Sequence, residues 1–133
     1  IEYYFVYMTG LAGKGSGYQN AGNSAELFSR LNPYFISVDS LTLFPDTELY
    51  QMAQQGLFVP AGEKERIREL QILINNLKIR THLFANTVSN FAPVTAYLPY
   101  DREKVTSELQ YVLDHTDEME MQEYRRSLKS LGY

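Results

Sequence analysis

The sequence predicts an α/β fold with parallel strands. Residues 2–8 are mostly aromatic and β-branched and alternate little, which is typical of a strand covered on both faces, and residues 34–40 and 81–85 are also predicted to be strands. Segments with helical spacing of apolar residues separate these stretches, and a polar loop follows each of them. Because parallel strands are joined by helical crossovers, this order predicts strand–helix–strand units and a parallel sheet.

Helices are expected wherever apolar residues recur at intervals of three and four. A short polar residue precedes most of these segments as a candidate N-cap. The expected helices cover residues 23–31, 46–55, 63–78, 100–114 and 117–131. Residues 95–99 are expected to be extended or irregular, so the predicted order is β, α, β, α, α, β, α, α. The charged run at residues 63–69 is interpreted as the solvated face of its helix.

The stretch FISVDSLTLFPDTELY, residues 35–50, joins a buried strand to a polar loop and then to a helix. Comparable loops follow the other two predicted strands, so the three loops cover residues 9–22, 39–46 and 86–93. The carboxyl ends of parallel strands meet at one edge of a sheet, where α/β proteins place their ligands. We therefore expect these loops to form a ligand-binding rim.

Composition excludes several classes of protein. The chain has 133 residues, of which 44% are hydrophobic, so it forms one domain or part of one. Its net charge of -4 argues against a nucleic-acid-binding surface. It contains no cysteine, which excludes disulfides and thiolate-held zinc or iron–sulfur sites within the chain. No apolar run reaches the roughly 20 residues of a membrane helix, and the expected location is the cytoplasm.

The sequence opens directly on a strand-like stretch that begins at Ile1, without an initiator methionine. Natural domains seldom start inside a central strand, because its edges then lack partners. We therefore expect the chain to be a fragment of a longer protein.

Common catalytic and nucleotide-binding motifs do not match the spacing in this chain. Gly13-Lys14 is followed by Gly15 instead of Ser or Thr, which rules out a P-loop. The order of strand, glycine loop, helix and second strand ending in Asp39 resembles a dinucleotide-binding unit, but the glycines do not match the GxGxxG spacing. The loop can also be interpreted as a surface loop that binds no ligand, and the sequence leaves both interpretations open. His82 and His115 lack metal-ligand spacing, and no GxSxG nucleophile elbow is present.

Five segments in order resemble the C-terminal half of a radical S-adenosylmethionine domain, of the kind called coproporphyrinogen III oxidase-like oxidoreductases. They are TGLAGK at residues 9–14, LNPYFI at 31–36, LTLFPDTELY at 41–50, NTVSN at 86–90 and LPYDREK at 98–104. The resemblance covers about residues 3–113. It implies that residues 1–92 form the C-terminal half of a partial (β/α) barrel with parallel strands and that residues 93–133 form a helical C-terminal extension.

The resemblance also implies a function for the parent protein. Members of that family hold a 4Fe-4S cluster through a CxxxCxxC loop and reductively cleave S-adenosylmethionine to start radical chemistry. This chain has no cysteine, so the cluster is expected in the missing N-terminal half. The fragment alone is expected to hold neither S-adenosylmethionine nor the cluster, and to be inactive, with no catalytic residue and no metal ligand of its own.

By the same resemblance, the backbone at Gly10 and Ser40 is expected to approach S-adenosylmethionine, and Leu41 to Leu43 to flank its adenine. Asn86 and Ser89 are expected on the substrate side. The expected partners are the missing half of the chain and, through the exposed edge of the first strand, a second copy. A non-catalytic α/β binding module is the alternative function, and a Rossmann-like nucleotide-binding dehydrogenase is the third choice.

Overall fold

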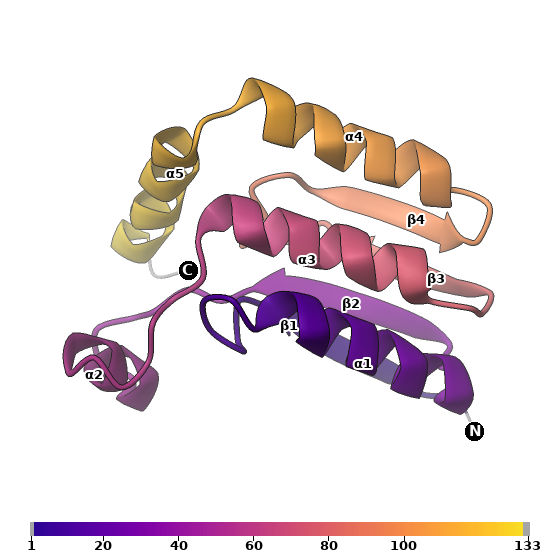
Figure 1. Cartoon of the computed structure of the whole chain (residues 1–133), viewed down its shortest axis with the longest axis horizontal. Helices are drawn as coiled ribbons and strands as arrows, with labels where there is room; N and C mark the ends of the chain where they lie inside the picture. The colour runs from indigo at the N-terminus through magenta and orange to yellow at the C-terminus, as the bar shows by residue number, and fades with distance from the viewer. Residues whose placement is uncertain (1, 132–133) are drawn as a thin grey trace.

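A mixed, open sheet of four strands with five helices forms the fold of residues 2–131, the part of the chain that the computed structural model describes (Figure 1). Ile1, the first residue of the strand-like stretch, lies outside the described residues, as do residues 132 and 133. The elements are β1 (Tyr4–Thr9), α1 (Gly17–Leu31), β2 (Phe35–Ser40), α2 (Glu48–Gln54), α3 (Glu63–Asn76), β3 (Thr81–Ala85), β4 (Val94–Leu98), α4 (Arg102–His115) and α5 (Glu118–Ser130).

The strands lie in the order β1-β2-β3-β4. The first three are parallel, with Tyr4 opposite Phe35 and Ile36 opposite Leu83, and they confirm the predicted α/β class. Strand β4 is antiparallel to β3, with Leu83 opposite Ala96. The β3–β4 connection is a loop without a helix, and a short loop can join only antiparallel neighbours. The predicted boundary at residue 92 falls in this loop.

Strand β4 is absent from the predicted order of elements. Its residues alternate between buried and exposed positions, which is the period of a strand with one covered face. The segment is short and flanked by Pro93 and Pro99, and these prolines favoured an irregular interpretation.

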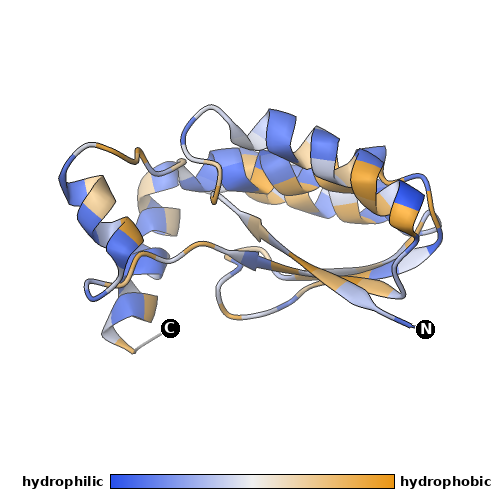
Figure 2. Cartoon of the chain, turned by 90° about the horizontal axis from the view of Figure 1, so that it is seen from below, coloured by the Kyte–Doolittle hydropathy of each residue, from blue (hydrophilic) through white to orange (hydrophobic). Residues whose placement is uncertain are grey.

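Helices α1, α3 and α4 lie side by side over one face of the sheet, and the hydrophobic core lies between them and the strands (Figure 2). Ile36, Leu73, Leu83 and Leu109 are fully buried there. The prediction that the first strand is covered on both faces is wrong, because Tyr4 and Val6 point to the other face and are 57% and 58% exposed.

A ladder of aromatic rings crosses this open face. The ring of Tyr4 stacks on that of Phe35 with centroids 4.6 Å apart, and Phe35 meets Phe84 at 5.6 Å. Further along, His82 stacks on Tyr97 at 4.6 Å. The rings belong to β1, β2, β3 and β4 in turn, so cross-strand aromatic pairs support the sheet from the side that the helices leave open.

Helix α1 begins six residues before its predicted start and shortens the glycine loop. Gly10 and Gly13 have φ values of 84° and 87°, and the Gly13 N–H donates to the Gly10 carbonyl at 3.1 Å, which forms a tight turn after β1. Gly17 lies in the first turn of α1, where an added Cβ atom would come within 2.6 Å of Glu69 Oε1. This glycine is therefore required by packing between α1 and α3.

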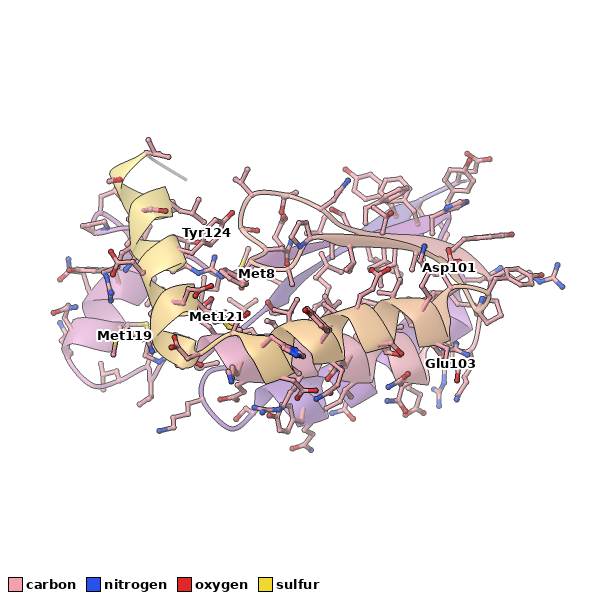
Figure 3. All side chains as sticks on the ribbon, turned by 90° about the horizontal axis from the view of Figure 1, so that it is seen from above. Met8, Asp101, Glu103, Met119, Met121 and Tyr124 are labelled. Atoms are coloured by element: carbon pink, nitrogen blue, oxygen red, sulfur yellow. The ribbon has the colours of Figure 1, made fainter. Side chains whose placement is uncertain are left out.

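Helix α5 lies across the end of the sheet where β1, β2 and β3 terminate, near Met8 (Figure 3). Met121 is buried on its inner side, and the Tyr124 hydroxyl donates to the Val88 carbonyl in the β3–β4 loop at 2.6 Å. No helix within residues 2–131 is both long enough and apolar enough to cross a membrane.

Candidate functional site

The ends of the three parallel strands converge as the sequence predicts. The Ser40 N–H, at the end of β2, donates to the Ser89 hydroxyl in the loop after β3 at 3.0 Å. The Leu41 N–H donates to the carbonyl of Thr9 at the end of β1 at 3.0 Å. The next residue after Thr9 is Gly10, so Gly10, Ser40, Leu41 and Ser89 meet at one edge of the sheet.

Arg66, in the first turns of α3, reaches into this convergence. Its Nη1 donates to the Ser40 hydroxyl at 3.2 Å and to the Leu41 carbonyl, and its Nε donates to the Ala61 carbonyl at 3.3 Å. An added Cβ at Gly10 would lie 3.0 Å from Arg66 Nε. The guanidinium therefore packs directly on the Gly10 backbone, and glycine is required there for both its positive φ and its lack of a side chain.

Arg125, on α5, binds the same converging strand ends from the side opposite to Arg66. All five of its guanidinium N–H groups are engaged. Nε and Nη2 bind the Glu63 carboxylate at 3.3 and 2.8 Å, and Nη2 also binds the Ser40 hydroxyl at 3.1 Å. Nη1 donates to the Thr42 hydroxyl at 3.0 Å and to the Ser89 carbonyl at 2.7 Å. A saturated guanidinium of this kind fixes the position of several segments at once.

Glu63 is shared by the two guanidinium groups. Its carboxylate lies 2.8 Å from Arg125 Nη2 and 3.7 Å from Arg66 Nε, and all three side chains are buried. Burial lowers the pKa of Arg66, and the nearby carboxylate of Glu63 opposes this shift. Arginine nevertheless stays protonated in proteins, so two positive charges and one negative charge are enclosed together.

A second buried carboxylate, Glu69, lies on the other side of Gly10. Its Oε1 accepts from the Gly10 N–H at 2.9 Å and its Oε2 from the Tyr7 hydroxyl at 2.5 Å, while Asn20 donates to that hydroxyl at 3.1 Å. Burial raises the pKa of Glu69, against the hydrogen bonds from Tyr7 and Gly10. Burial also raises the pKa of Tyr7, and the Glu69 carboxylate adds to that shift.

Helix α5 completes the rim at the N-terminus of α3. The Glu118 carboxylate accepts from the N–H groups of Glu63 at 2.7 Å and Lys64 at 3.0 Å. These are orphan donors of the first helical turn, and Gly62, the residue at the N-cap position, has no side chain to satisfy them. An acidic side chain from a different helix therefore supplies the cap.

A pocket of about 290 Å³ opens between these elements. Its apolar wall comes from Leu41, Leu43, Pro60 and Ala61, and its charged wall from Glu63, Arg66, Glu118, Arg125, Arg126 and Lys129. A hollow of about 20 Å³ adjoins it between Thr9, Ser40, Asn90 and the two buried arginines, which is room for one water molecule.

Most of the residues predicted for the site lie together. Gly10, Ser40, Leu41 and Ser89 surround the two arginines, and Leu43 lines the pocket. Asn86 is exposed on the β3–β4 loop, where its neighbour Thr87 is the residue that binds the Asp39 carboxylate, at 2.7 Å.

The interpretation of the charged run at residues 63–69 as a solvated face is wrong. Glu63, Arg66 and Glu69 are buried, and Glu69 is 0% exposed. The sequence holds a weak signal for this, because Arg66 and Glu69 occur at helical spacing with the buried Leu70 and Leu73. Arg125 gives the same signal, four residues after Met121 and three before Leu128.

The residues present do not fit an iron–sulfur cluster. The chain has no cysteine, and residues 2–131 contain no group of three His, Asp or Glu side chains arranged to hold a metal ion. The rim instead offers an apolar wall beside positive side chains, which suits an organic ligand with an anionic group. Comparisons with protein families, with curated proteins and with solved structures found no match to this chain.

Proposed function

We propose that this chain is part of a radical S-adenosylmethionine protein and supplies one wall of its S-adenosylmethionine site. The observation that carries this proposal is the convergence of Gly10, Ser40, Leu41 and Ser89 beside the pocket lined by Leu43. S-adenosylmethionine combines an adenine ring with a positive sulfonium and an amino-acid group whose carboxylate is its one negative charge. The apolar wall at Leu41 and Leu43 supports binding of the adenine, and the positive side chains support binding of the carboxylate.

The sheet supports the proposal of a partial (β/α) barrel. Its parallel strands follow each other in chain order, and helices α1 and α3, which connect them, cover one face only (Figure 1). In a (β/α) barrel the helices form the outer ring and side chains fill the interior. The open aromatic face of β1–β4 would then point to the barrel interior.

The cluster that cleaves S-adenosylmethionine in that family would have to come from residues outside these 133, because the chain holds no cysteine. S-adenosylmethionine and the 4Fe-4S cluster would supply the radical chemistry in the parent protein. The residues of this chain would position the cofactor, and the chain alone would be inactive.

The order of the strands counts against the dehydrogenase alternative. Doubly wound dinucleotide-binding sheets reverse their strand order, and the ligand binds at the point of reversal. The order β1-β2-β3-β4 contains no reversal within residues 2–131. The non-catalytic binding module would use the same pocket, and ligand binding by the whole parent protein would separate it from the radical enzyme.

Calorimetry of the whole parent protein with S-adenosylmethionine, NAD and ATP tests the proposed function. We expect S-adenosylmethionine to bind more tightly than the other two ligands, and Leu43→Asp to weaken this binding by at least about tenfold, because it places a carboxylate in the apolar wall. Leu57→Asp is the matched control, since Leu57 is 69% exposed and does not line the pocket. Tighter binding of NAD, or equal loss in both variants, would contradict the proposal.

We also propose that the free edge of β1 pairs with the missing half in the whole protein and with a second copy in this chain alone. The carbonyls of Tyr3 and Thr9 accept N–H groups from Tyr34 and Leu41, so the peptide groups of alternate residues face β2. Those of Tyr4, Val6 and Met8 then face the free edge. A two-fold axis at Val6 would place Tyr4 opposite Met8 of the other copy, with apolar side chains on the same face.

Light scattering over a range of concentrations checks this pairing. We expect a concentration-dependent dimer, and we expect Val6→Lys to weaken it by at least about tenfold, because lysine at a strand edge opposes pairing. Thr95→Lys, exposed on the same face of the sheet but in β4, should leave the dimer unchanged. A monomer at every concentration would show that the edge does not pair.

A further inference from the structure

The pocket beside α5 is positive although the chain as a whole carries a net charge of -4. Its wall holds Arg66, Arg125, Arg126 and Lys129 against only two carboxylates. Both carboxylates are already bound: Glu63 by Arg125, and Glu118 by the N–H groups at the start of α3. Four cations therefore face these two carboxylates and Glu123, the partner of Arg126, and one positive charge is left over.

Two of the cationic side chains are also engaged. Arg125 uses all five of its N–H groups, and Arg126 pairs with Glu123. Within the described part of the chain, Lys129 and the Nη2 group of Arg66 make no hydrogen bond and no ion pair. The open donors thus come from α3 on one side and from α5 on the other.

The open Nη2 group belongs to a side chain that is only 6% exposed. Within residues 2–131, every side-chain nitrogen or oxygen that is fully buried has a hydrogen-bond partner. Because Nη2 has no partner, it is not fully buried, and it must reach the space that Arg66 lines. Of the two hollows beside Arg66, the smaller has room for one water, and the larger, of about 290 Å³, has room for a small ligand.

We infer that this pocket binds a small organic oxyanion, a carboxylate or a phosphate ester. Arg66 Nη2 donates to its oxygens from the bottom of the pocket, and Lys129 neutralises it at the mouth. The fixed fork of a guanidinium matches both kinds of oxyanion. The apolar body of the ligand lies on Leu41, Leu43 and Pro60, which form the uncharged wall. The pocket is the same one that the proposed function gives to S-adenosylmethionine. The inference goes beyond that function in the class of ligand, because it is argued from Arg66 and Lys129 and does not depend on the resemblance.

NMR titration of the whole chain with inorganic pyrophosphate and, separately, with benzoate tests the inference at constant ionic strength. The expected result is a saturable shift of the Arg66 Nε–Hε signal and of the Lys129 amide. Lys129→Gln should weaken binding at least about threefold, and Lys104→Gln, exposed on α4 away from the pocket, should not. Saturation by pyrophosphate alone assigns a phosphate ligand, and saturation by benzoate alone assigns a carboxylate.

Arg66→Lys removes the fork but keeps the charge, and it should abolish the saturable shift at the Lys129 amide, with circular dichroism reporting whether the variant is folded. If it does not fold, Lys129→Gln alone decides. The inference is overturned if neither anion gives a saturable shift, or if Lys129→Gln and Lys104→Gln bind as the unmodified chain does. A failure of S-adenosylmethionine to bind would overturn the proposed function and leave this result untouched.

Discussion

Replacing Arg125 with alanine is expected to lower the free energy of unfolding by about 3–5 kcal/mol. The substitution leaves the buried Glu63 carboxylate with Arg66 as its remaining ion-pair partner, at 3.7 Å. It also removes hydrogen bonds to Ser40, Thr42 and Ser89. Urea unfolding followed by circular dichroism measures the loss. We expect most of it to persist in Arg125→Met, because methionine restores volume but not charge.

Arg126→Ala is the matched control for this prediction. Arg126 is the next residue on α5, and its ion pair with Glu123 is largely exposed. Exposed pairs contribute little, so the change should stay within about 0.5 kcal/mol. Equal losses in the two alanine variants would mean that helix propensity, and not the buried ion pair, holds α5 in place.

Replacing Glu69 with glutamine is expected to change how stability depends on pH. Burial raises the pKa of Glu69 above its ordinary value of 4.5, so the folded state binds this proton more tightly than the unfolded state does. The stability that Glu69 contributes is therefore complete below about pH 4.5 and is lost as the pH rises through the raised pKa. Glutamine does not titrate, so the free energy of unfolding of the unmodified chain should fall relative to Glu69→Gln over this range.

Urea unfolding of both proteins between about pH 4 and pH 8 measures this difference, and each unit by which the pKa is raised corresponds to about 1.4 kcal/mol. Glu108→Gln, at an exposed position of α4, serves as the control and should leave the pH profile parallel to that of the unmodified chain. A difference between the Glu69→Gln protein and the unmodified chain that stays constant with pH would mean that burial does not shift this carboxyl.

Local signals in the sequence were enough to predict most of the helices and strands. The strand at Thr81–Ala85 has its predicted bounds, and the Thr47 side chain caps α2 by accepting from the Tyr50 N–H. The start of α1 could not be predicted in the same way. Gly17 disfavours a helix by local propensity, and its reason for being there is Glu69, 52 positions later in the sequence.

Some residues of the candidate site could likewise be predicted from the sequence, and others could not. The loops and strand ends that hold Gly10, Ser40, Leu41 and Ser89 could be predicted to meet because the carboxyl ends of parallel strands lie at one edge, and the resemblance selected these four residues within them. Arg66 and Arg125 could not, because a charged residue on a helix is ordinarily solvated. Their burial depends on partners such as Ser40 and Glu63, which lie on other elements and come together only in the folded chain.

The carboxylate of Glu118, on α5, caps the N-terminus of α3, and this contact also affects the order in which the chain can fold. The N–H groups that it caps belong to residues 55 and 54 positions earlier. During synthesis, β1, β2, α3 and β3 are complete before that carboxylate exists, so water must satisfy the first N–H groups of α3 until then. We therefore expect the turn that carries Arg66 into the rim to be fixed late, when the final helix packs against it.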